Sequence, residues 1–202
     1  MTGSAGTIIN VDGLVNNAIE IDSAGTVQGQ GSVGGVSLIG AGKLAPGLSA
    51  SATANGTLTA SGTVSFDAAG TASLSIRLGQ TTAGGVDTLA IASTGTIGNL
   101  NNTTLSISTG TAYVSPSIGS VFVIIDGSAV AGTGLIQGQF AQGANIGVGT
   151  DIFNILYNVD ATGLNPGPDV VLLAVPEPST WALMIGGIGM LALTQRLRRR
   201  LS

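Results

Sequence analysis

Carboxylates are the main side chains with which this sequence could carry out acid–base chemistry, because its 202 residues include no histidine and no cysteine. The commonest general base, a thiolate nucleophile and the usual zinc ligands are therefore missing from it. Glu20 and Asp22 alternate with apolar residues, so both carboxylates should lie on one face of a strand. There they could pair as acid and base or hold calcium, but a solvated strand face explains the same pattern. We expect no catalytic residue, no metal site and no cofactor.

The segment around Asp87 is a second candidate for chemistry. Gly84-Gly85-Val86-Asp87 is similar to the start of the calcium-binding nonapeptide of β-rolls. The second glycine spacing fails, however, and no tandem copy follows. We therefore expect Asp87 to be a turn or cap residue.

The charge distribution separates the last part of the chain from the rest. Before Glu177 the basic residues are Lys43 and Arg77, against nine aspartates and glutamates. This acidic body argues against binding of nucleic acid. With 44% hydrophobic and 8% charged residues, the composition is also unlike that of a disordered chain, so we expect an ordered body.

An uncharged stretch of about 18 residues between Glu177 and Arg196 is near the lower length limit for a transmembrane helix. Its aromatic and large aliphatic residues would face the interface and the lipid: Trp181, Leu183, Met184, Ile185, Ile188, Met190, Leu191 and Leu193. A basic cluster follows, made of Arg196, Arg198, Arg199 and Arg200. Because basic flanks stay in the cytoplasm, the body should lie across the membrane from them. We predict a helix over residues 181–193.

The segment just before the apolar run contains the sequence Val175-Pro176-Glu177-Pro178-Ser179. The two prolines should keep it extended, which suits a protease. This segment is followed by one apolar span and then by a terminal arginine cluster. The three parts in this order resemble the PEP-CTERM sorting signal of Gram-negative bacteria. That resemblance implies recognition by an exosortase at the inner membrane, processing near the motif, and delivery to the cell surface or the extracellular space. Family members occur in bacteria that export polysaccharide, which makes extracellular polysaccharide a candidate partner.

Residues 1–110 contain many short segments in which apolar and polar residues alternate. Ala72, Leu74, Ile76 and Leu78, for example, alternate with Ser73, Ser75 and Arg77. Such alternation predicts half-buried strands, and the recurring Gly-Thr pairs indicate a degenerate repeat with a period near 20. We predict an all-β fold whose first part is a parallel β-helix, or solenoid. The stretch from Gly31 to Leu58 resembles the passenger segments of autotransporters.

Residues 111–174 have longer and bulkier apolar segments. We expect strands at Val121 to Ile125, at Phe153 to Val159 and at Val170 to Ala174, with a turn at Asn165 to Pro168. We interpret this region as a β cap that covers the last open coil. Residues 175–202 form the sorting signal.

The first residues, Met1 to Gly6, lack the basic and apolar regions of a signal peptide. Either Met1 lies inside a longer gene product, which we favour, or the chain is not exported as written. Two functions remain open. The protein could be a structural or adhesive surface component, which we favour, or a carbohydrate-active β-helix enzyme or glycan-binding module. An enzyme would need two carboxylates at a catalytic separation beside a sugar platform.

Overall fold

A computed structural model describes residues 2–3, 5–48, 54–79, 85–130, 136–163, 165–176, 183–184, 186–191 and 195–196. The described body is built from β-strands arranged in two sheets. The larger sheet contains β1 (Thr2–Gly3), β3 (Leu14–Ile21), β5 (Ser32–Leu38), β7 (Thr57–Ala60), β8 (Thr63–Ser65), β10 (Thr88–Ile91), β11 (Thr96–Ile97), β13 (Val121–Asp126), β14 (Asn145–Val148), β15 (Asp151–Val159) and β16 (Pro166–Val175). The smaller sheet contains β2 (Ile8–Asn10), β4 (Thr26–Gly29), β6 (Lys43–Pro46), β9 (Ser73–Leu78) and β12 (Thr104–Thr109).

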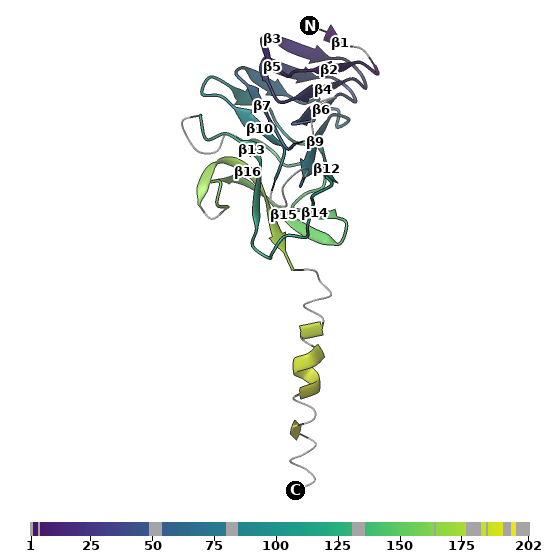
Figure 1. Ribbon diagram of the computed structural model, residues 1–202, viewed down its shortest axis with the longest axis vertical. Helices are drawn as coiled ribbons and strands as arrows, with labels where there is room; N and C mark the ends of the chain where they lie inside the picture. Colours follow the sequence, from purple (N-terminus) through teal and green to yellow (C-terminus); the bar gives the residue numbers. More distant parts are fainter. Residues whose placement is uncertain are drawn as a thin grey trace.

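From β1 to β13 the chain passes back and forth between the two sheets, and the strand pairs named for this part are parallel. Thr2 pairs with Glu20, whereas Leu89 pairs with Ile125, so the length of chain between paired strands roughly doubles along the body. The prediction of a mostly β body with parallel strands is confirmed (Figure 1). The closed solenoid that we inferred from it stays a prediction.

Strand β9 shows why these residues fold as they do. Leu74, Ile76 and Leu78 are fully buried, while Ser73 and Arg77 on the other face are half-buried. Their alternation was predicted from the period of two, and it is confirmed. In β3, Ile19 and Ile21 are buried in the same way.

Glycine allows the backbones of successive passages to approach closely. A Cβ atom on Gly62 would collide with the carbonyl oxygen of Gly34, and a Cβ atom on Gly34 would collide with that of Asn16. These three positions therefore follow one another across the layers of the body. Glycine is therefore required at Gly34 and Gly62, because a larger residue would push the neighbouring strands apart.

The pairing changes direction at β13. This strand is parallel to β10 on one side and antiparallel to β16 on the other, where Val121 pairs with Leu173. Strand β16 lies between β13 and β15, and β15 pairs with β14. The rings of Phe122 and Phe153 pack edge to face with their centroids 5.9 Å apart. Figure 1 shows β14 to β16 at the end of the body away from the N-terminus.

Three of the strands expected in residues 111–174 are present as β13, β15 and β16. The turn expected at residues 165–168 is wrong, because β16 already begins at Pro166. An irregular register, in which Val159 faces both Asp169 and Pro166, accommodates the prolines at the strand end. The division of the chain into 1–110, 111–174 and 175–202 stays a prediction.

A buried ion pair connects segments that lie far apart in the sequence. The Asp87 side chain is 1% exposed, and its Oδ2 lies 3.2 Å from Nε of Arg77, without the alignment of a hydrogen bond. Its Oδ1 accepts hydrogen bonds from the Gly56 N–H (3.0 Å) and from Nδ2 of Asn55 (3.1 Å). Burial raises the pKa of Asp87, while the Gly56 N–H, Arg77 and Asn55 act to lower it.

The arginine completes this network on its other side. Nη2 of Arg77 donates to the carbonyl groups of Gly47 (3.2 Å) and Ala54 (3.0 Å). Gly47 has a φ of 72°, and a Cβ atom there would overlap the Asp87 carboxylate, so the position suits only glycine. The ion pair therefore holds β9, the start of β10 and the connection between β6 and β7 in one arrangement.

We expect Arg77→Met to lower the free energy of unfolding by about 3 kcal/mol, because it leaves the buried Asp87 carboxylate without its cation. Chemical denaturation measures the change. Lys43→Met removes the other basic residue of the body and is the matched control, with an expected change below about 0.5 kcal/mol. The double variant Arg77→Met, Asp87→Asn should recover part of the loss. A single variant that is no less stable than the lysine control would contradict a structural role for the pair.

Candidate functional site

The predicted sorting motif begins at the last residue of β16. Val175 pairs with Ile152 of β15, and Pro176 follows it outside the strand. On the other side of β16, Gly119 N–H donates to the Ala174 carbonyl and Ala174 N–H donates to the Ser120 carbonyl, both at 2.9 Å. The chain therefore passes from a strand with neighbours on both sides directly into the motif. Glu177, Pro178 and Ser179 lie outside the described residues.

Part of the predicted apolar helix is described. Residues 183–184 and 186–191 are helical, in agreement with the prediction, while Trp181, Ile185 and Leu193 lie outside the described residues. The apolar side chains Leu183, Met184, Ile188, Met190 and Leu191 are exposed. In the parts of the chain that the structure describes, none of the helices has the length and apolar character needed to cross a bilayer. The transmembrane role of residues 181–193 stays a prediction.

The basic cluster is described at its first member only. Arg196 is exposed, and Arg198, Arg199 and Arg200 lie outside the described residues. The placement of the arginines on the cytoplasmic side, which rests on their charge, stays a prediction.

The two carboxylates considered for chemistry lie in and just after β3. Glu20 and Asp22 are both exposed, and they point away from the core formed by Ile19 and Ile21. Over the described ranges, no group of three or more aspartate, glutamate, histidine or cysteine side chains is arranged to hold a metal ion. The geometry at Glu20 and Asp22 is that of a solvated strand face.

A second group of carboxylates lies beside the start of β16. Asp169 is 2% exposed, and its Oδ1 accepts a hydrogen bond of 2.9 Å from the Gly127 N–H. Burial raises the pKa of Asp169; the Gly127 N–H lowers it, and the negative charges of Asp126 and Asp160 raise it further. The Gly127 N–H therefore holds the Asp169 carboxyl group in place at the start of β16.

The raised pKa of Asp169 predicts that its contribution to stability is present at low pH and is lost as pH rises through the folded-state pKa. The free energy of unfolding should therefore increase as pH falls from 7 towards the ordinary aspartate value of 3.8. Asp67 acts in the opposite direction, because the N–H groups of Ala69 and Gly40 lower its pKa. Its contribution to stability is lost only at pH values below 3.8, which lie outside this range. Urea denaturation between pH 7 and pH 4 measures the trend.

Asp169→Asn keeps an acceptor for Gly127 and should be more stable than the original chain at pH 7, with a flatter pH profile. Asp12→Asn, at an exposed carboxylate, is the control and should leave the profile unchanged. An unchanged slope in the Asp169 variant would assign the pH dependence to other groups.

A polar groove lies between the edge strand β12 and the connection from β14 to β15. It has a volume of about 540 Å³ and is lined by Ile107, Ser108, Thr109, Tyr113, Ser115, Gly147, Val148, Gly149, Thr150 and Asp151. At one side of it, the Tyr113 hydroxyl donates a 2.6 Å hydrogen bond to Oδ2 of Asp151. Burial raises the pKa of Tyr113, and the bond to Asp151 and its negative charge raise it further. Sequence reasoning missed this pair, because no local pattern connects residues 38 positions apart.

The comparisons with known proteins bear on the end of the chain. No curated protein and no solved structure matches this sequence. Residues 174–200 match the family model described as the PEP-CTERM protein-sorting motif. The match begins one residue before the end of β16, where the chain leaves the folded body. The protein therefore carries a PEP-CTERM protein-sorting motif at its C-terminal end, as the order of its prolines, apolar residues and arginines predicted.

Proposed function

We propose that this protein is an exported bacterial surface protein that an exosortase recognises through its C-terminal motif, and that its body has a structural or adhesive role outside the cell. The observation that supports the sorting step is the match of residues 174–200 to the PEP-CTERM protein-sorting motif. The motif also begins where β16 ends, so an enzyme can reach the peptide after Pro176 without unfolding the body.

Each part of the tail has a separate task in this proposal. Residues 181–193 cross the inner membrane as a helix, and the arginines from Arg196 onward stay in the cytoplasm. The body then lies on the far side of the membrane. Pro176 and Pro178 lack backbone donors, so they stop β16 from extending and keep the peptide around Glu177 open to an exosortase. Processing there transfers the acidic body to the cell surface or releases it.

The proposed role of the body rests on its repetitive architecture. Parallel strands stacked as in a solenoid present a long polar surface, and that shape suits a matrix component or an adhesin. The buried side chains of Asp87 and Asp169 both accept hydrogen bonds from backbone N–H groups, which is a structural use of these residues. We therefore do not assign the protein a catalytic function.

Replacing Pro176, Glu177 and Pro178 together by alanine should abolish processing, because the extended conformation and the carboxylate are lost together. The experiment uses a version of the chain that carries a signal peptide, expressed in a host with an exosortase. Intact mass and membrane fractionation report cleavage and location. The original chain should lose its tail and reach the surface, whereas the triple variant should remain full length in the inner membrane.

Thr180→Ala, which lies within the matched residues 174–200 but leaves Pro176, Glu177 and Pro178 unchanged, is the control and should be processed normally. If the original chain and the triple variant both remain full length in the inner membrane, the tail is a plain anchor and the sorting proposal fails.

A glycan-binding module is the second candidate, and the polar groove at β12 favours it. Hydroxyl groups of Ser108, Thr109 and Ser115 line the groove together with the Tyr113 ring and the Asp151 carboxylate. Sugars are bound by such combinations of hydrogen-bonding groups and an aromatic surface. Asp151 is the carboxylate among the residues that line the groove, so the pair of carboxylates that most glycosidases need is not found there.

If this groove binds glycans, the full chain should be retarded in affinity electrophoresis through gels that contain dextran, xanthan or cellulose derivatives. Tyr113→Ala should reduce the retardation severalfold, because it removes both the ring and the hydroxyl that orients Asp151. Ser37→Ala, on β5 of the larger sheet and not among the residues that line the groove, is the control. Equal migration of the original chain with and without each polysaccharide would exclude glycan binding of these types.

A further inference from the structure

The distance between the folded body and the predicted membrane segment is short. Val175 is the last residue of β16, and Trp181 begins the apolar run. Six residues reach at most about 20 Å, even when fully extended. If the tail spans a membrane, as the proposed function requires, the end of β16 must therefore face the bilayer and stay close to its headgroups.

One loop lies at this end of the body. It joins β12 to β13 over residues 110–120, and it is fixed to β16 by the two backbone hydrogen bonds between Ala174 and the residues Gly119 and Ser120. Its other end is held by a hydrogen bond of 2.9 Å from the Ala112 N–H to the Gly79 carbonyl. The loop is thus attached within two residues of the point where the chain leaves the body.

The loop contains no charged residue and exposes large apolar side chains. Val114 is 62% exposed and Ile118 is 67% exposed. The other large apolar side chains that are exposed in the described body are Ile8, Leu14 and Ile39, which all belong to its first passages. Two of the five exposed apolar side chains therefore belong to the loop that is hydrogen-bonded to the end of β16.

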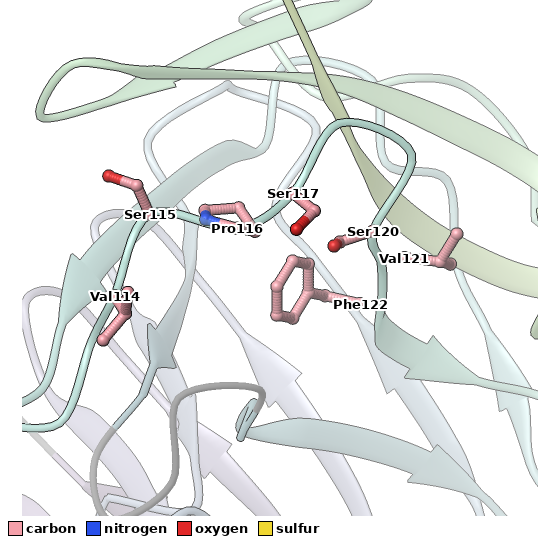
Figure 2. Close-up of a pocket in the computed structure, with 7 residues that line it drawn as sticks. All are labelled: Val114, Ser115, Pro116, Ser117, Ser120, Val121 and Phe122. Carbon is pink, nitrogen blue, oxygen red and sulfur yellow. The ribbon is translucent and has the colours of Figure 1, made fainter.

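Figure 2 shows the pocket behind this loop, which has a volume of about 450 Å³. Its lining consists of Val114, Ser115, Pro116, Ser117, Ser120, Val121 and Phe122. The ring of Phe122 lies on the inner side of the loop, opposite Ser117 and Ser120 (Figure 2). Apolar groups alternate here with small hydroxyl groups, which is a composition that can enter the boundary between headgroups and acyl chains.

We propose that the loop at residues 110–120 rests in the headgroup region of the same bilayer that holds the tail, with Val114 and Ile118 inserted below the headgroups. The binding is apolar rather than electrostatic, because the loop carries no basic residue. Asp151, at the start of β15, accepts a hydrogen bond from the Tyr113 hydroxyl of this loop. The lipid surface that fits this loop is therefore one rich in zwitterionic lipid, and added salt should change the contact little. This inference rests on the proposed function, since it needs the tail to be in the membrane.

The absence of cysteine from the sequence makes a direct test simple, because one introduced thiol can be labelled without side reactions. Ile118→Cys and Val114→Cys carry an environment-sensitive fluorophore at the loop. Leu14→Cys, at an exposed position in the first passages, carries it as the matched control. Each full-length variant is reconstituted into vesicles of the zwitterionic lipids phosphatidylethanolamine and phosphatidylcholine, with or without lipids that bear a quencher below the headgroups. Circular dichroism checks that each variant keeps its β structure.

The proposal expects a blue-shifted emission and a severalfold loss of fluorescence with quencher lipids at residues 114 and 118, and neither change at residue 14. Vesicles in which the chain floats with the lipid while both loop labels stay unquenched would overturn the loop contact and leave the sorting proposal intact. A chain that does not float with the vesicles at all would overturn the membrane role of the tail, and the loop contact with it. If the blue shift of the emission appears only when exosortase is added, the loop contacts the enzyme and not the lipid. That result would also overturn the proposal.

Discussion

The pairing of β13 with β16 is the interaction on which the rest of the structure depends. A stack of parallel strands ends in a strand with unpaired backbone groups, and such an edge invites pairing with other chains. Here β16 covers that edge by running antiparallel to β13, and β15 then covers β16. The same strand brings the sorting motif to the end of the body. Closure of the sheet and exit of the chain are thus accomplished by one element.

The positions of strands were predictable wherever one face of a strand is buried and the other is not. Leu74, Ile76 and Leu78 could be assigned to the core from their spacing alone, because an error of one residue would expose all three. The start of β16 was not predictable, since two prolines in four residues indicate a turn in most contexts. Only pairing with β15 and an irregular register make a strand of this segment.

The sorting motif could be recognised from the sequence, whereas the polar contacts within the body could not. The sorting motif is contiguous, so its prolines, apolar run and arginines could be recognised together. The contacts of Arg77 with Asp87, and of Tyr113 with Asp151, join residues from different passages of the chain. Which polar residues come into contact depends on the length of chain between paired strands. That length changes along the body, and no local sequence pattern predicts it.

The central position of β16 has a mechanical consequence for a protein that is held by its C-terminal end. A force applied at Val175 acts along the axis of β16, whereas the hydrogen bonds to β13 and β15 run nearly perpendicular to that axis. All of these bonds therefore bear the load together and in shear, and none of them can be peeled open singly. A body pulled at this point should yield only when the two ladders break together, because the load runs along β16 and both of its neighbours share it.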